Sequence, residues 1–408
     1  MGPRAGRAVA ALNSFELDTL LIPDARRRRL RGTVRRTVSK ACARVGPSRG
    51  SHGPPGPPKL GFVATAEKYR RFGAESAGAS PLYERLAIAL SESEEALRAI
   101  DSLPARKRNP ALVLAALNDL ALAGRAPLLA AAYAAAEGEA AAAIDTLTRM
   151  PEAVAEIVVR RQVRADETGR GAVLRPLIAE AAQRAGAEAV GLIDVGCSAG
   201  FNLDVDRVGI AYGNGQTLGE ASSPVQLSAS VVGERPIPVA AMPAVVARVG
   251  IDANPVDVTD ADEARWLRAC LPPDQPERLA KLDAEIALAA KAPPVLLAGD
   301  ALEALPDAFA HVPADALPVV TTTWALSRLS LEGRLRFLHR LDDVAAHRPL
   351  VWVSAEGVGV APAIPTFGDR RASGHSILGV AVFHGAAAHV EAVGRCWSQG
   401  RLLAWLAG

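Results

Sequence analysis

The stretch Gly191-Leu-Ile-Asp-Val-Gly-Cys-Ser-Ala-Gly-Phe-Asn-Leu203 decides how this chain is interpreted. A short apolar run ends in Asp194, and three small residues follow at alternate positions, Gly196, Ser198 and Gly200. This pattern predicts a buried strand, a tight turn and the N-terminus of a helix. Parallel α/β proteins seat ligands with this arrangement.

Two kinds of enzyme site fit the same letters. Written as Asp-x-Gly-x-x-x-Gly, the stretch is typical of the cofactor loop of methyltransferases that use S-adenosylmethionine. Written as Gly-x-Ser-x-Gly, it is the nucleophile elbow of an α/β-hydrolase, with Ser198 as the nucleophile. The choice between them depends on the rest of the chain.

Charge divides the 408 residues unevenly. The chain is 50% hydrophobic and 22% charged, with a net charge of +2, which is ordinary for a globular protein. Residues 1–60 carry +10, so residues 61–408 carry −8. We therefore expect no nucleic acid as a partner of the folded part.

Several other classes of protein are disfavoured. The four cysteines include no Cys-x-x-Cys pair, so we expect no zinc, no other metal and no redox motif. No window of about eighteen uninterrupted apolar residues is present, which predicts no membrane span. We expect a cytoplasmic protein that acts on a small molecule. The sequence does not indicate its oligomeric state.

Composition predicts three segments. Residues 1–60 contain a basic run and a Gly/Pro-rich stretch, and we interpret them as a disordered appendage. Residues 61–187 carry only helical periodicity, which predicts an N-terminal helical domain that caps a second domain. Residues 188–408 form that second domain, with a hairpin inserted near 209–243.

The second domain alternates short apolar runs with helices. The strands are expected at 190–195, 245–251, 295–298, 318–323 and 349–354, with the first intervening helix at 199–207. Such alternation predicts a doubly wound, Rossmann-like parallel sheet. After the fifth strand, residues 376–384 and a run from 388 are separated by only three residues, so they form an antiparallel pair. This layout is that of the class I methyltransferases.

Three acidic residues close the first three strands. Asp194, Asp252 and Asp300 would all face one crevice, because ligands of open α/β sheets bind beyond the carboxyl ends of the strands. Gly196, Ser198 and Gly200 would let the backbone approach the ligand. Asp252 is placed to bind the ribose hydroxyls of S-adenosylmethionine, and Asp300 the adenine amino group. Each aspartate taken alone also fits a helix N-cap.

Residues for the chemistry itself are less well defined. Candidates are Glu167 in the polar stretch before the first strand, Thr323 at the end of the fourth strand, and His375 before the sixth. The hydrolase alternative would use Ser198 with Asp300 and either His375 or His384. Only helices precede the first strand, however, whereas the hydrolase elbow follows several strands. Methyl transfer needs positioning more than acid–base catalysis.

A series of short motifs resembles a bacterial family of uncharacterised proteins, domain of unknown function 2332. The motifs, in chain order, are Tyr69-Arg-Arg-Phe72, Ser80-Pro-Leu-Tyr83, Asp166-Glu-Thr-Gly-Arg170, Asp194-Val-Gly-Cys-Ser-Ala-Gly200, Ser223-Pro224, Val249-Gly-Ile-Asp-Ala-Asn-Pro255, Val258-Thr-Asp260, Trp266-Leu267 and Gly299-Asp-Ala301. The resemblance covers roughly residues 61–360 and implies a fold similar to the methyltransferases. Members of this family tend to carry Gln-Thr-Asn-Glu where this chain has Val163-Arg-Ala-Asp-Glu167, and Phe-His-Ser where it has Thr321-Thr-Thr323.

The sequence therefore predicts a methyltransferase-like α/β domain that binds S-adenosylmethionine, behind a helical domain. Two alternatives stay open. The first is an esterase that uses Ser198, and the second is a non-catalytic relative that binds a nucleotide-like ligand or a protein.

Overall fold

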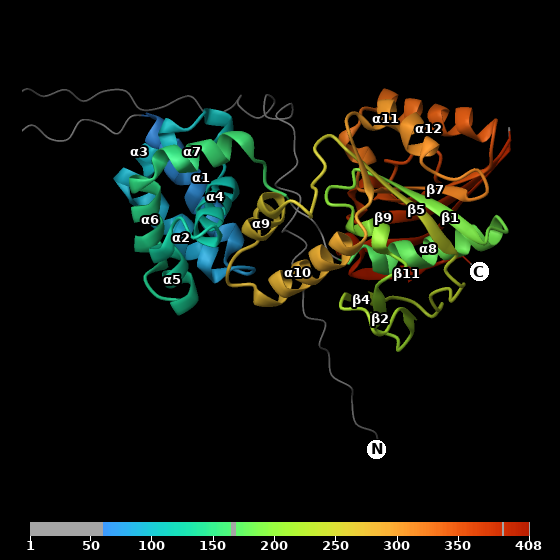
Figure 1. The fold of residues 1–408 in the computed structure, drawn as a ribbon, viewed down its shortest axis with the longest axis horizontal. Coiled ribbons are helices and arrows are strands. Elements are labelled where there is room, and N and C mark those ends of the chain that lie inside the picture. Colours follow the sequence, from blue (N-terminus) through green and yellow to red (C-terminus); the bar gives the residue numbers. More distant parts are fainter. Residues whose placement is uncertain (1–59, 165–168, 386, 408) are drawn as a thin grey trace, which may run out of the picture.

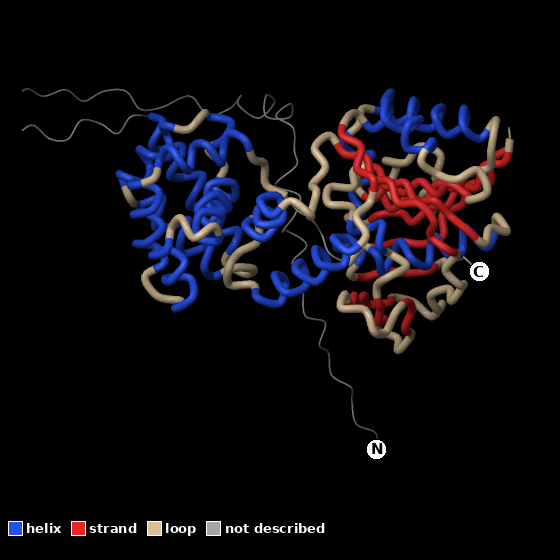
Figure 2. The backbone as a smooth tube through the Cα atoms, in the orientation of Figure 1, coloured by secondary structure: helices blue, strands red, loops and turns tan. Residues whose placement is uncertain are grey.

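The computed structural model describes residues 60–164, 169–385 and 387–407. They form two bodies, one of helices and one built around a sheet (Figures 1 and 2). The helices are α1 Leu60–Ser76, α2 Pro81–Glu92, α3 Glu94–Ser102, α4 Pro110–Leu122, α5 Pro127–Ala135, α6 Glu139–Arg149, α7 Pro151–Arg160, α8 Gly171–Arg184, α9 Ala261–Ala269, α10 Pro276–Lys291, α11 Ala301–Ala310 and α12 Leu331–Ala345. The strands are β1 Ala189–Val195, β2 Gly209–Tyr212, β3 Thr217–Gly219, β4 Gln226–Val231, β5 Ala244–Asp252, β6 Val295–Ala298, β7 Leu317–Thr323, β8 Leu350–Gly357, β9 Ser376–His384, β10 Ala387–Trp397 and β11 Leu402–Trp405. The appendage expected at residues 1–60 lies outside the described residues apart from its last position.

The helical body contains α1 to α7 arranged around α4. Pro110 begins α4, and the Asn109 side chain accepts a hydrogen bond from the N–H of Ala111, as is usual for an N-cap. Most of α4 is buried among leucines and alanines of the surrounding helices. The helical part predicted from periodicity is confirmed.

One helix of this body comes from much later in the chain. Trp266 of α9 is 1% exposed and belongs to the same apolar cluster as α4. The Asn118 side chain donates hydrogen bonds to the carbonyls of Ala269 and Leu271, and Arg265 forms an ion pair with Asp119 at 2.8 Å. The chain therefore leaves the sheet after β5, completes the helical body, and returns through α10 (Figure 1).

The sheet has the strand order β3-β2-β4-β11-β10-β9-β8-β7-β1-β5-β6. The strands β6, β5, β1, β7 and β8 are parallel to one another. β9, β10 and β11 continue the sheet as antiparallel neighbours. The protein is thus an α/β protein with a mostly parallel mixed sheet, as predicted.

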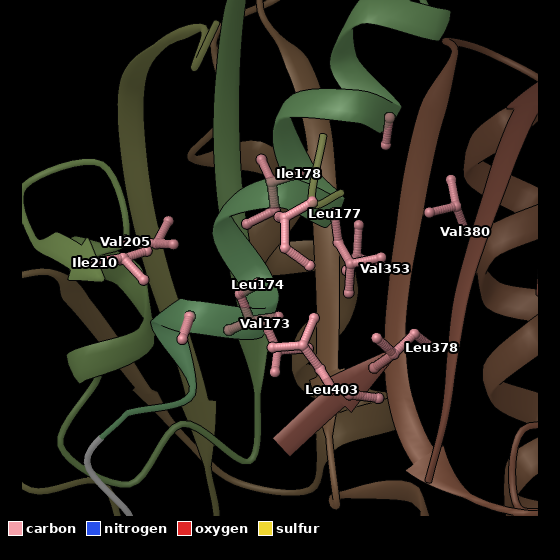
Figure 3. Packing of buried hydrophobic residues seen from close by; sticks show 14 of the residues in the cluster. Val173, Leu174, Leu177, Ile178, Val205, Ile210, Val353, Leu378, Val380 and Leu403 are labelled. Carbon is pink, nitrogen blue, oxygen red and sulfur yellow. The ribbon is translucent and has the colours of Figure 1, made fainter. Parts of the chain in front are cut away.

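Helices cover both faces of the sheet. α11 and α12 lie on one face and α8 on the other (Figure 1). Figure 3 shows Leu174, Leu177 and Ile178 of α8 against Val353 and Val380 of the sheet. By packing, α8 belongs with the sheet and α9 with the helices, so the two bodies do not follow the sequence boundary expected at residue 187.

The region after β1 differs from the expectation in two ways. In place of a helix over 199–207 the chain makes a short 3-10 turn, η3, at Phe201–Asp204, which follows Gly200 in a left-handed conformation with φ of 76°. The hairpin expected near 209–243 is β2 with β3. A further strand, β4, pairs in parallel with β2 and with β11, and so extends the sheet.

No single helix among the described residues is long and apolar enough to cross a membrane. α4 and α5 reach that length only together, and they bend by 100° at the break between them.

Candidate functional site

The order in which the chain adds strands to the sheet reverses between β1 and β7. From β1 the chain proceeds outward through β5 to β6, and it then returns to β7 and β8 on the opposite side of β1. A crevice forms at such a topological switch point, beyond the carboxyl ends of the strands. Asp194 on β1 and Thr321 on β7 are register partners just before this point.

The loop after β1 has a conformation that few residues adopt. Gly196, Ser198 and Gly200 have φ values of 78°, 50° and 76°, in the left-handed region that glycine tolerates best. The backbone N–H groups of Gly196 and Cys197 both donate to the carbonyl of Ile251 on β5. The alternating small residues recognised in the sequence thus form one tight turn fixed to the neighbouring strand.

Asp194 is completely buried at the centre of the switch point. Its carboxylate accepts hydrogen bonds from the Thr321 hydroxyl at 2.6 Å and from the Asn202 amide at 3.0 Å. Burial raises the pKa of Asp194, and these two hydrogen bonds oppose the rise. Asp194 therefore holds β1, η3 and β7 together beneath the loop.

The polar network continues from Asp194 toward α8. The Asn202 amide also donates to the Thr323 hydroxyl at 3.3 Å, and the Arg170 guanidinium donates to the same hydroxyl at 3.2 Å. Arg170 lies over the ring of Trp324, 5.2 Å from its centroid, in a cation–π contact. Thr323 is thus where groups from three segments meet.

Trp324 is held in a strained conformation at the end of this network. Its φ is +54°, which costs a bulky residue on the order of 1–3 kcal/mol. The indole N–H donates to the Ser376 hydroxyl at 2.8 Å, and the backbone N–H donates to Ala355. Such strain is concentrated at functional sites in proteins.

Asp252 connects the loop after β1 with the loop after β5. Its carboxylate accepts hydrogen bonds from the backbone N–H of Ser198 at 3.1 Å and of Asn254 at 2.9 Å. The Arg164 guanidinium, from the segment after α7, lies 3.9 Å away. Only 9% of Asp252 is exposed. A carboxylate has about four acceptor positions, so these contacts leave room for ligand hydroxyls.

Asp300 lies beside Asp252 at the end of β6. The backbone N–H of Gly299 donates to the Asp252 carbonyl at 3.0 Å. Asp300 itself is exposed and forms the N-cap of α11, where its side chain accepts from the N–H of Leu302 at 2.9 Å. Asp300 is therefore a helix N-cap, the role that the sequence alone also allowed for each of the three aspartates.

The three candidates for catalysis have different surroundings. Thr323 is part of the network. Glu167 lies outside the described residues. His375 directly precedes β9, two strands away from β7. There its ring nitrogens contact the Asp369 carboxylate at 2.8 Å and the Ser373 carbonyl at 3.3 Å. Both nitrogens of His375 therefore already have partners.

The serine of the hydrolase alternative is not joined to a histidine in this structure. The Ser198 hydroxyl is buried and has no hydrogen-bond partner among the residues that the structure describes. His384 ends β9, which runs antiparallel to β8. It therefore lies at the opposite end of the strands from Ser198. A Ser–Asp–His triad needs these groups within hydrogen-bond distance.

Glu356 and Asn202 are site residues that the sequence interpretation missed. The Glu356 carboxylate, 1% exposed at the end of β8, accepts from the N–H groups of Ala325 and Leu326, both at 2.9 Å. Burial raises its pKa to about 7, against these bonds and the nearby charge of Arg334. Asn202 lies within the stretch of residues 191–203 that opened the sequence analysis. Its position eight residues after Asp194 is the sequence feature that could have identified it.

Within the described ranges, no three or more His, Cys, Asp or Glu side chains are grouped so that they could hold a metal ion.

The structure is thus an open, mostly parallel α/β sheet with a cluster of polar residues at its switch point. The family described as an uncharacterised protein conserved in bacteria (DUF2332) matches residues 66–405. The chain belongs to this family. No curated protein matches it.

Proposed function

We propose that this protein binds S-adenosylmethionine at the carboxyl ends of β1, β5 and β6 and methylates a small molecule. The observation that carries the proposal is the position of three aspartates at the carboxyl ends of neighbouring strands. Asp194 is one residue before the end of β1, Asp252 is the last residue of β5, and Asp300 is two residues after the end of β6. Open α/β sheets bind nucleotide-like ligands beyond these strand ends. One aspartate in such a position is commonly a cap, whereas three side by side favour a ligand site.

The loop after β1 fits such a cofactor. Its alternating left-handed residues bring the backbone to the surface of the turn without large side chains. The buried Ser198 hydroxyl, without a partner in the described part of the chain, is available to a ligand atom. Asp252 would hold the ribose and Asp300 the adenine amino group, as expected for a class I methyltransferase-like fold.

The cofactor, when bound, supplies a methyl group already activated by its sulfonium, so the protein has to position more than to activate. Thr323 and Trp324, at the end of β7, would position the acceptor next to the loop. The negative charge of residues 61–408, −8, favours a small acceptor over nucleic acid.

Binding tests this proposal directly. Titration of S-adenosylhomocysteine into the full chain by calorimetry should give a dissociation constant in the micromolar range. Asp252→Asn should weaken this binding at least tenfold, because an amide replaces the carboxylate that would face the ribose. Asp257→Asn is the matched control, since Asp257 is exposed five residues further on, and it should leave binding unchanged.

A folded protein that does not bind S-adenosylhomocysteine would overturn the proposal. Equal weakening by both variants would do so too, because the effect would then reflect general charge. Binding with no methylated product from any acceptor would identify a non-catalytic relative instead.

An esterase is the second candidate, and one observation favours it. Ser198 has φ of +50° in a Gly-x-Ser-x-Gly turn, as expected for a strained nucleophile elbow. A fluorophosphonate probe, which labels activated serines, tests it on the intact chain. Labelling that Ser198→Ala abolishes would establish the esterase, and the absence of labelling would exclude an activated Ser198.

A further inference from the structure

The turn after β7 begins with a strained residue. Trp324 has φ of +54°, a conformation that a bulky residue keeps only when its surroundings hold it there. Its indole N–H donates to the Ser376 hydroxyl at 2.8 Å, and its backbone N–H donates to the Ala355 carbonyl at 3.1 Å. These two bonds join Trp324 to β9 and β8, but they do not hold the two residues that follow it.

A single carboxyl group holds those two residues. Oε1 of Glu356 accepts hydrogen bonds from the N–H groups of Ala325 and Leu326, both at 2.9 Å. The Arg334 guanidinium of α12 donates to the Leu326 carbonyl at 2.9 Å. The conformation of residues 324–326, which we call the tryptophan turn, therefore depends on Glu356 at its N–H groups and on Arg334 at its last carbonyl.

The tryptophan turn adjoins both parts of the proposed site. Arg170 lies over the Trp324 ring, 5.2 Å from its centroid, where we place the acceptor. Ala325 abuts the loop after β1, because a Cβ at Gly196 would lie 3.0 Å from the Cβ of Ala325. Any movement of the turn would therefore shift the wall of the acceptor site relative to the cofactor loop.

Glu356 is buried, although it can carry a charge. It is 1% exposed, and its second oxygen, Oε2, has no hydrogen-bond partner among the residues that the structure describes. Burial raises the pKa of Glu356 from 4.5 to about 7, against its two backbone hydrogen bonds and the positive charges of Arg334 and Arg170. Its register partner on β9, Ile377, does not titrate.

We propose that Glu356 is a positioning residue of the acceptor site: its protonated carboxyl group holds the tryptophan turn in place, and its ionised form releases the turn. The direction follows from linkage, because a carboxyl group that keeps its proton more firmly beneath the turn than in water favours the closed turn when it is protonated. Once Glu356 is ionised, burial of its charge is costly, and movement of the turn admits water to it.

The Trp324 ring is thus fixed in acid and loosens as the pH rises through about 7. This inference deepens the proposed function and rests on it only for the role of Trp324 as a wall of the acceptor site.

Fluorine NMR of the full chain labelled with 5-fluorotryptophan tests the inference. The chain has five tryptophans, and the signal that is missing from Trp324→Phe belongs to Trp324. This signal should shift and broaden as the pH rises from 5 to 8, with a midpoint near 7. In Glu356→Gln it should keep its low-pH position throughout, because the amide oxygen accepts from the same N–H groups and no proton is lost.

His375→Gln is the matched control. His375 directly precedes Ser376, which accepts from the Trp324 indole, and histidine titrates in the same pH range. This variant should retain the midpoint of the Trp324 signal. The signals of the other tryptophans show whether each variant is folded. A Trp324 signal that does not change with pH would overturn the inference, as would a titration that survives Glu356→Gln or disappears in His375→Gln.

The inference and the proposed function fail separately. If S-adenosylhomocysteine binds and the Trp324 signal does not titrate, the cofactor site stands and the role of Glu356 is wrong. If the Trp324 signal titrates through Glu356 and S-adenosylhomocysteine does not bind, Glu356 controls the tryptophan turn and the proposed methylation is wrong.

Discussion

The two bodies of this protein use buried polar residues differently. In the helical body, such side chains act separately on single helices or on one pair: Ser80 caps α2, Thr146 donates to its own helix, and Asn118 joins α4 to the end of α9. In the sheet body, Asp194, Thr323 and others gather at one end of the strands. Burying polar groups is costly unless they are paired.

The contrast shows where in this fold the features that reduce stability are located. Helix caps and links are distributed wherever a helix ends, so their positions follow the local architecture. The polar residues at the switch point form one continuous network, with a strained Trp324 and a Glu356 of raised pKa beside it. Concentrated strain and shifted pKa values are typical of a functional site.

The largest effect that we expect tests the helical side of the comparison. Trp266→Ala should lower the free energy of unfolding by roughly 3–5 kcal/mol, because it leaves a cavity in the core of the helical body. Urea unfolding measures this. Leu128→Ala on α5, where the side chain is 72% exposed, is the control and should change stability by no more than about 0.5 kcal/mol. A small effect of Trp266→Ala would mean that α9 is not part of that core.

The second prediction concerns how the stability of the sheet body depends on pH. Burial raises the pKa of Glu356 from 4.5 to about 7, so the folded state holds a proton that the unfolded state releases. The contribution of Glu356 to stability is complete below pH 4.5 and declines as the pH rises to about 7, by roughly 3 kcal/mol in total.

Glu356→Gln should remove this decline, since the amide oxygen still accepts from Ala325 and Leu326 and no proton is exchanged. Unfolding in urea at pH 5 and pH 8 provides the comparison between the variant and the original chain. If the two lose the same stability over this interval, Glu356 is ionised in the folded state at both pH values.

A third prediction separates strain from ligand binding. Gly196→Ala and Gly215→Ala both introduce a side chain at positive φ, 78° and 87°, and each should cost about 1 kcal/mol or more. A Cβ at Gly196 would also lie 3.0 Å from the Cβ of Ala325, whereas Gly215 has open space around it. Of the two variants, only Gly196→Ala should weaken the binding of S-adenosylhomocysteine, which calorimetry measures. Equal affinities of the two variants would argue against a cofactor at this loop.

The smallest effect concerns Asp300, which has two possible roles. Asp300→Ala should cost about 1 kcal/mol because it removes the N-cap of α11. Asp300→Ser keeps a cap but loses the carboxylate, so stability should be nearly unchanged while affinity for S-adenosylhomocysteine falls. Thermal unfolding and calorimetry on both variants distinguish the roles, and unchanged affinity in the serine variant would leave Asp300 as a cap alone.

The sequence was informative where structure depends on neighbouring residues. Alternation of apolar runs with helices predicted the five parallel strands, and the order of small residues after Asp194 predicted a tight turn. The helix expected over 199–207 is the short η3 instead, which begins only after Gly200, a residue in left-handed conformation. Local patterns therefore identified most elements correctly and misjudged the region after β1.

Contacts between distant segments could not be predicted in the same way. Nothing in the amphipathic pattern of α9 distinguishes a helix that covers the sheet from one that completes another body. The pairing of β4 with β11 joins residues 172 positions apart, as in Ser230 and Leu402. Glu356 was missed for the same reason, since its donors, Ala325 and Leu326, are about thirty residues earlier.

The position of α9 has a consequence for how the protein is made. Domains generally fold as units during synthesis, the N-terminal one first, but the helical body needs Trp266, which the ribosome adds only after β1 to β5. Until then α4 has an uncovered apolar surface, which a chaperone would recognise. We therefore expect the first half of the chain to remain incompletely folded during synthesis and both bodies to reach their final form together.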